Sequence, residues 1–315
     1  MNSEKEYLFT ISGFISGRLS LHGYIIVLFM TIFLLKMTAL IIMVIDHIGA
    51  YIPDTPVQMR WIGRIAAPIF IFCLCEGVDH TSNEKKYLLR LYLGSVLMAV
   101  IQAVTGIRAN IFRTLFAIAF CCIMIKNIKK GNREYKKYFL IYLIWQLITV
   151  LGFGYMYSRN QSVMVRRLYS ALTGSVAFCE GGVPYIIFGI MIYLLKNDKK
   201  KLALGFTAFT AVYALLSLTN ITTALTNPII AMADNPDRMN RVIQFGFFTL
   251  CNAFRPGITG KDPFTGSYQW MMIASLGFIL MYNGQKGRSM KWFFYVFYVC
   301  HLLVLWYIGQ IMTAH

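Results

Sequence analysis

Asp46 and His47 are adjacent ionisable residues near the end of an apolar stretch that begins around Leu34. An aspartate near the middle of a membrane helix costs roughly 2.5–3.5 kcal/mol to insert, so such residues usually serve a function. An imidazole has an unperturbed pKa of about 6.5, which suits proton transfer. Because consecutive helical residues point about 100° apart, the two side chains do not face each other and need partners from other helices. The pair predicts proton-transfer chemistry; the alternative is that it only ends a helix at the membrane surface.

A second apolar stretch carries Arg64, Pro68, Glu76 and His80. Arg64 is expected near the level of Asp46, which favours a contact between the two helices. Pro68 is expected to kink the helix and free a backbone carbonyl. Glu76 and His80 are four residues apart and share a helix face. The alternative is that Arg64 reaches the headgroups and that Glu76 and His80 form a pair at the membrane surface.

Tyr298 and His301 lie one helical turn apart near the end of the chain. They could contact a substrate, although residue type alone favours a structural role within a helix bundle. The sequence has no glycine-rich phosphate motif, no H-E-x-x-H and no nucleophile elbow. Metal catalysis and serine hydrolysis therefore have no support.

Composition indicates the elements that must position these residues. Hydrophobic residues make up 57% of the chain and charged residues 14%, against about 25% charged in a soluble domain, and the mean hydropathy is +0.59. Several stretches reach the roughly 20 residues that cross a bilayer. We therefore predict an all-α polytopic membrane bundle of about nine to ten helices. The candidate spans are Phe29–Tyr51, Trp61–Asp79, Tyr87–Thr105, Phe112–Ile128, Tyr138–Tyr157, Leu168–Leu195, Leu202–Thr219, Tyr268–Tyr282 and Trp292–Met312.

Two regions depart from this pattern. Residues 7–28 are apolar but interrupted by glycine and polar residues, so we predict that the N-terminal segment 1–28 lies along the membrane surface. The remainder, 29–315, is expected to form one transmembrane domain with an external loop at 220–267. Within that loop, 241–254 could form a short helix or a re-entrant segment; if it crossed the membrane, the number of spans and the side of the C-terminus would change.

Basic residues predict the orientation. Lysine and arginine concentrate in the loops at 126–137, 196–201 and 286–291, with a weaker cluster at 84–90. Cytoplasmic loops carry such an excess, so we expect a cytoplasmic N-terminus in a multi-pass protein of the cell membrane. The net charge of +17 is divided among these loops, so it predicts contact with membrane lipids or a phosphorylated ligand and no nucleic-acid partner.

Three segments then resemble a known family. They are 35–49, 62–70 and 76–91, and together with 294–302 they are similar to the TraX family of membrane acetyltransferases. Val299-Cys300 stands where that family's last helix would have Tyr-Pro before His-Leu. The resemblance implies acetylation of the N-terminal amine of pilin, and kinship with transmembrane acyltransferases that use cytoplasmic acetyl-CoA.

The resemblance also implies roles for the ionisable residues. His47 would be the general base, Asp46 would orient or charge-balance the site, and Arg64 would stabilise an oxyanion or hold an anionic acceptor. Further substrate contacts are expected from Glu76, His80, Tyr298 and His301. The candidates for binding the phosphates of acetyl-CoA are Lys85, Lys86, Arg90, Lys286, Arg288 and Lys291.

The acceptor and the class of protein stay open at this point. A pilin-like peptide, a glycan, a lipid or a small molecule could each accept the acetyl group. The same ionisable residues would suit a proton-coupled transporter or flippase, although no internal inverted repeat is evident. A non-catalytic membrane subunit is the third possibility, and it predicts that His47→Ala leaves function intact.

Overall fold

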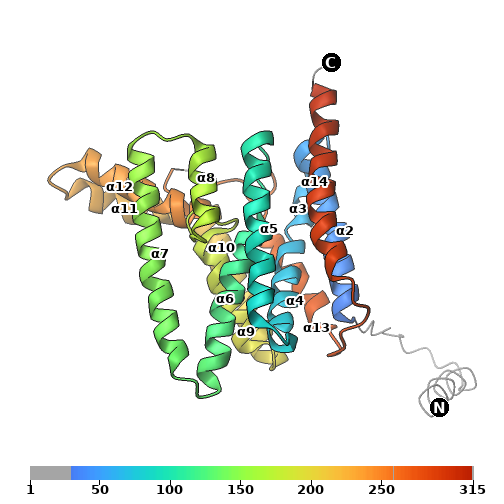
Figure 1. Cartoon of the computed structure of the whole chain (residues 1–315). Coiled ribbons are helices and arrows are strands. Elements are labelled where there is room, and N and C mark those ends of the chain that lie inside the picture. Colours follow the sequence, from blue (N-terminus) through green and yellow to red (C-terminus); the bar gives the residue numbers. More distant parts are fainter. Residues whose placement is uncertain (1–29, 258, 314–315) are drawn as a thin grey trace, which may run out of the picture.

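The chain folds as a bundle of helices (Figure 1). The computed structural model describes residues 30–257 and 259–313, which confirm the predicted all-α class. The expected surface segment at 1–28 lies outside the described residues. The helices are α2 (Ile32–Tyr51), α3 (Gln58–Gly63), α4 (Ala66–His80), α5 (Glu84–Thr105), α6 (Ile111–Lys129), α7 (Glu134–Ser158), α8 (Val163–Leu172), α9 (Gly182–Leu195), α10 (Lys199–Leu218), α11 (Ile221–Ala231), α12 (Pro236–Leu250), η1 (Asn252–Phe254), η2 (Gln269–Ile273), α13 (Ala274–Leu280) and α14 (Lys291–Thr313).

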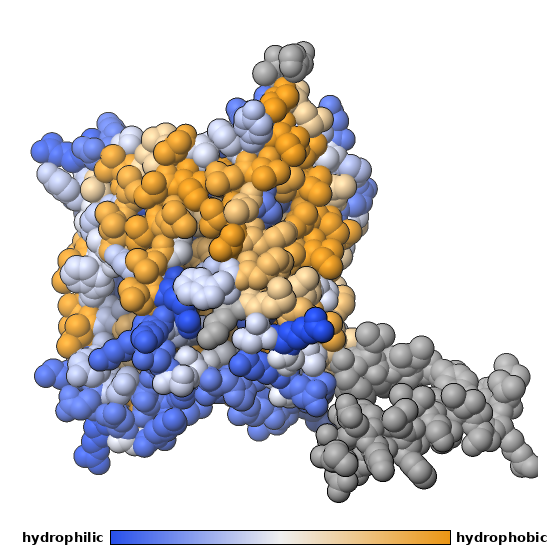
Figure 2. All heavy atoms as spheres, turned by 45° about the vertical axis from the view of Figure 1, so that its right-hand side comes forward, coloured by the Kyte–Doolittle hydropathy of each residue, from blue (hydrophilic) through white to orange (hydrophobic). Residues whose placement is uncertain are grey.

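Seven helical segments of the described chain are long and apolar enough to cross a membrane: α2, α3 with α4, α5, α6, α7, α10 and α14. Shorter apolar helices are α9, α11 and η2 with α13. Helices α4 and α6 are the most buried of the long ones and form the centre of the bundle. Figure 2 shows a broad apolar surface, the apolar belt, on the face in view, with hydrophilic residues gathered below it. The protein is therefore a multi-pass membrane protein.

The two ends of the bundle differ in their charged residues. The loops at 126–137, 196–201 and 286–291 lie at the lower end in Figure 1, which we call the lysine-rich end. Helix α2 starts at this end. The amides of Ile32 and Phe33 donate to the carbonyls of Gln285 and Lys286 at 2.9 and 3.1 Å, which ties the start of α2 to the loop at 286–291. Helix α2 then runs to the opposite end, where α3, α8, α11 and α12 lie.

The second crossing is interrupted as expected. Helix α3 ends at Gly63 and α4 begins at Ala66. Pro68 has no amide hydrogen to donate to the carbonyl of Arg64 four residues earlier, which accounts for the break. Gly63 packs directly against the Asp46 side chain, which a Cβ at this position would overlap. The break and the glycine together bring Arg64 close to α2.

The prediction of one helix over Leu168–Leu195 is wrong. Helix α8 ends at Leu172 and α9 begins at Gly182, with a loop at 173–181 between them. Gly174 and Gly181 have φ of 64° and 75°, a left-handed conformation that glycine adopts readily. The apolar residues on both sides of this loop led to the prediction of one continuous helix. The loop places an acidic residue, Glu180, inside the bundle.

The region at 220–267, which was expected to be an external loop, is largely helical. Helix α12 covers most of 241–254, in agreement with the expectation of a short helix there. Its start is defined by Pro236 in the first turn and by the Asn235 side chain, which accepts from the amide of Arg238 at 2.9 Å. Helix α12 is not among the apolar segments that could cross a membrane.

Candidate functional site

A cavity of about 620 Å³ runs through the bundle and joins groups from both of its ends. At the lysine-rich end it is lined by Lys36, Arg90, Lys286 and Arg288, and at the opposite end by Asp46, His47, Arg64 and Glu180. Lys36 and His47 both belong to α2 and lie about 16 Å apart along its axis, at a helical rise of about 1.5 Å per residue. The cavity therefore reaches across much of the apolar belt.

His47 is bound by a second histidine. Its Nδ1 lies 2.7 Å from Nε2 of His301 on α14, and the two rings stack with centroids 5.0 Å apart. Nδ1 of His301 is 2.8 Å from the carbonyl oxygen of Phe297. A carbonyl only accepts, so His301 donates from Nδ1 and its Nε2 accepts from Nδ1–H of His47. This chain leaves Nε2 as the basic nitrogen of His47.

Asp46 is held by two arginines. Nη2 of Arg64 donates to both carboxylate oxygens of Asp46, at 2.8 and 2.9 Å, so the expected contact between the helices is present. Nη1 of Arg60 lies 2.8 Å from Oδ1 and also donates to the Asp46 carbonyl. Among the described residues Asp46 makes no hydrogen bond to His47. His301, and not Asp46, fixes the imidazole directly.

Glu180 is a site residue that the sequence reasoning missed. It lies in the loop between α8 and α9, and its Oε2 accepts from the amide of Asn110 at 2.9 Å. The Glu180 carbonyl accepts from the Thr114 hydroxyl at 2.7 Å. Glu180 lies inside the bundle and is enclosed by protein. Its exposed surface is the part that faces the cavity. An acidic residue before the Gly181-Gly182 pair in an apolar stretch was the signal that could have found it.

Tyr298 lines the cavity, and its hydroxyl makes a structural hydrogen bond. Its hydroxyl accepts from the amide of Ile111 at 3.2 Å, which satisfies a free amide at the start of α6. Its ring packs edge-on to Phe112, with centroids 4.9 Å apart. Its hydroxyl therefore serves the start of α6, while its ring forms part of the cavity wall.

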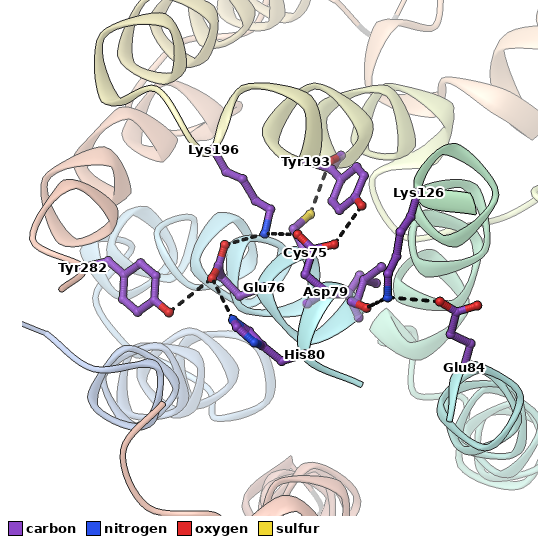
Figure 3. Close-up of polar contacts among 12 residues, drawn as sticks. Cys75, Glu76, Asp79, His80, Glu84, Lys126, Tyr193, Lys196 and Tyr282 are labelled. Carbon is purple, nitrogen blue, oxygen red and sulfur yellow. Dashed lines mark hydrogen bonds and ion pairs between the residues drawn. The ribbon is translucent and has the colours of Figure 1, made fainter. Parts of the chain in front are cut away.

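Glu76 and His80 lie elsewhere, in a cluster at the lysine-rich end that does not line the cavity (Figure 3). Glu76 is 2.6 Å from Nζ of Lys196, and Lys196 is 2.8 Å from Asp79. The Tyr282 hydroxyl donates to Glu76 at 3.2 Å, and His80 is largely exposed, 3.8 Å from Glu76. The structure thus separates these two predicted substrate contacts from His47.

Lys196 is the centre of this cluster and follows the last turn of α9. Burial alone would lower the pKa of Lys196, but the contacts with Asp79 and Glu76 outweigh it and raise that pKa. The side chain therefore stays charged and ties α4 to the end of α9.

The predicted phosphate-binding residues divide into two groups. Arg90, Lys286 and Arg288 line the cavity, whereas Lys85 and Lys86 are exposed and do not. Lys291 begins α14, and its side chain lies outside the described part of the structure. Lys36 joins the first group and lies 5.6 Å from the centre of the Phe294 ring.

A family model described as TraX protein matches residues 32–248 and 261–309. That range includes α2 and most of α14, the helices of the two histidines. Searches of curated proteins and of solved structures gave no match.

Proposed function

The chain belongs to the TraX family, and from this premise we propose that it is a membrane acyltransferase. It would move an acetyl group from acetyl-CoA to an amine or hydroxyl acceptor on the other side of the membrane. The observation that supports the proposal is a cavity that has basic groups at the lysine-rich end and His47 toward the opposite end.

The lysine-rich end suits the donor. Arg90, Lys286 and Arg288 line the cavity there and would bind the phosphate groups, and Lys36 adds a fourth cation farther along the cavity wall. The excess of lysine at this end supports its placement in the cytoplasm, where acetyl-CoA is found. An extended pantetheine arm would cover much of the 16 Å or so between Lys36 and His47.

His47 is the proposed general base. Its Nε2 takes the proton from the acceptor N–H or O–H while the acceptor attacks the thioester carbonyl. The carbon–sulfur bond then breaks, the electron pair stays on sulfur, and the proton passes from His47 to the departing thiolate. His301 holds the Nδ1–H side of the ring and so keeps Nε2 available. A positioned base of this kind contributes about 10²–10⁴-fold in rate.

Arg64 is the proposed group for the oxyanion. Its Nη2 is bound to Asp46 and its Nε donates to the Arg60 carbonyl at 3.2 Å. These contacts fix the plane of the guanidinium and leave Nη1 to donate to a group in the cavity. Asp46 thereby acts on the site through Arg64, as a positioning residue.

The test uses the purified full-length protein in detergent. Acetyl-CoA is expected to raise the unfolding temperature of wild type and of His47→Ala, whereas transfer of radiolabelled acetyl groups should be lost in His47→Ala only. His80→Ala is the matched control, because His80 is exposed and lies outside the cavity. If correctly folded wild type does not bind acetyl-CoA, the proposal is wrong and a transporter becomes the better explanation.

A further inference from the structure

Three arginines of the cavity wall at the opposite end have no acidic partner in the part of the chain that the structure describes. Arg108 lies in the connection between α5 and α6, Arg113 lies in α6 and Arg167 lies in α8, and all three line the cavity. No carboxylate lies within 4.0 Å of any of their nitrogens among the described residues. The mechanism proposed for His47, Asp46 and Arg64 gives these three arginines no role.

Arg113 is the most informative of the three. Only 3% of the residue is exposed, and its Nη2 donates to the carbonyl of Phe178 at 2.8 Å. Its Nε and Nη1 are buried and have no hydrogen-bond partner among the described residues. A buried charged group left unsatisfied in this way is costly, and a ligand that accepts from it would remove the cost.

Arg108 and Arg167 repel each other across the same part of the cavity. Burial and the charge of Arg108 lower the pKa of Arg167, which belongs to α8 outside the apolar helices. Arg167 makes one long hydrogen bond, of 3.4 Å to the Ile107 carbonyl, and Arg108 makes none through its side chain among the described residues. An anion between them would turn this repulsion into attraction.

The balance of charge in this half of the cavity is positive. Among the described residues, Arg64, Arg108, Arg113 and Arg167 face two carboxylates there, those of Asp46 and Glu180. Asp46 is already bound by Arg64 and Arg60, so Glu180 is the described carboxylate left to offset the other three arginines. The donors of three guanidinium groups exceed what the two oxygens of a carboxylate can accept, whereas a phosphate offers more oxygens and suits arginine geometry.

We infer that the opposite end of the cavity binds a phosphate group carried by the acceptor, through Arg108, Arg113 and Arg167. This inference rests on the proposed function and specifies its acceptor as a phosphate ester with a nearby amine or hydroxyl. Phosphate binding there would hold the nucleophile beside Nε2 of His47. A lipid headgroup and a soluble phosphate ester share this chemistry.

The test measures binding of inorganic phosphate and of glycerol 3-phosphate to the full chain in phospholipid-free detergent, by isothermal titration calorimetry. Arg108→Gln and Arg167→Gln should each weaken binding at this site about tenfold, since each removes a charge-assisted contact. Arg288→Gln is the matched control, because it removes a cavity arginine at the lysine-rich end. Binding of acetyl-CoA is measured on the same samples.

The expected pattern is reciprocal. Arg108→Gln and Arg167→Gln should lose phosphate affinity at their own site and keep acetyl-CoA affinity. Arg288→Gln should lose acetyl-CoA affinity and keep phosphate binding at the site of Arg108 and Arg167. Phosphate binding that is absent from folded wild type, or unchanged in both arginine variants, would overturn the inference. Wild type that binds phosphate but not acetyl-CoA would instead remove the proposed function. If phosphatidylglycerol competes with phosphate in wild type but not in Arg167→Gln, the phosphate belongs to a lipid headgroup. If phosphatidylglycerol does not compete, the phosphate belongs to a soluble ester. Either result supports the phosphate site.

Discussion

Nδ1 of His47 lies 2.7 Å from Nε2 of His301, a residue 254 positions later in the chain. This contact joins the first and last described helices, α2 and α14, and sets which nitrogen of His47 carries the proton. The carbonyl of Phe297 is the fixed acceptor at the end of this chain of hydrogen bonds. The basic nitrogen of His47 is therefore determined by a backbone group of α14 and needs no carboxylate.

His301→Leu should lower kcat for acetyl transfer about 10–100-fold while the affinity for acetyl-CoA is unchanged, by analogy with other residues that orient a functional histidine. Leucine fills the space but cannot accept from Nδ1–H of His47, so the ring loses its fixed tautomer. His301→Gln should recover part of the rate, because its side-chain carbonyl can accept the same hydrogen bond. Steady-state kinetics and a pH–rate profile check this.

A structural role for His301 alone would give a different result. His301→Leu and His301→Gln would then have equal rates, and the pH–rate profile would match that of wild type. His80→Leu serves as the control, because it changes an exposed histidine outside the cavity.

Asp46→Asn should destabilise the protein by about 3 kcal/mol, because it leaves two arginines without their shared carboxylate. The side chain of Asp46 is 13% exposed, and those of Arg60 and Arg64 are 28% and 21% exposed, so solvent screens this pair only in part. Thermal unfolding in detergent measures the change. Asp54→Asn is the control, since Asp54 is exposed and asparagine tolerates its φ of 56°. Equal unfolding temperatures for the two variants would contradict this account.

Lys196→Met should lower the unfolding temperature and leave the affinity for acetyl-CoA unchanged. Only 4% of the Lys196 side chain is exposed, and its loss leaves Glu76 and Asp79 without their common cation. Lys201→Met is the matched control at the same end, because the side chain of Lys201 is 72% exposed. Loss of acetyl-CoA binding in a Lys196→Met protein of normal stability would instead place the cluster in donor binding.

The long apolar helices and the contact between Arg64 and Asp46 could be predicted from sequence, for the same physical reason. An ionisable residue in hydrocarbon needs a partner, and the level of Arg64 in the second crossing made it the candidate. The break in the second crossing could be predicted in the same way. Pro68 has no amide hydrogen, so a helix that contains it loses the backbone hydrogen bond to the carbonyl of Arg64.

The rest of the site depended on how helices pack, which sequence separation hides. His47 and His301 are both visible as polar residues in apolar stretches, but nothing in either stretch specifies that α2 lies against α14. Glu76 and His80 were expected to contact the substrate, yet Glu76 pairs with Lys196 and both residues lie outside the cavity. The loop at 173–181 was missed because the apolar residues on both sides of it outweighed its own turn signals, Gly174 and Gly181.

Glu180→Gln should strengthen binding of inorganic phosphate several-fold at the opposite end of the cavity. The change removes the one negative charge there that no arginine binds within 4.0 Å among the described residues, and glutamine can still accept from the amide of Asn110. Calorimetry with Glu84→Gln as the control makes the comparison, because Glu84 pairs with Lys126 outside the cavity. Phosphate affinity that is lowered by Glu180→Gln would mean that Glu180 supports the arginines and does not compete with the ligand for them.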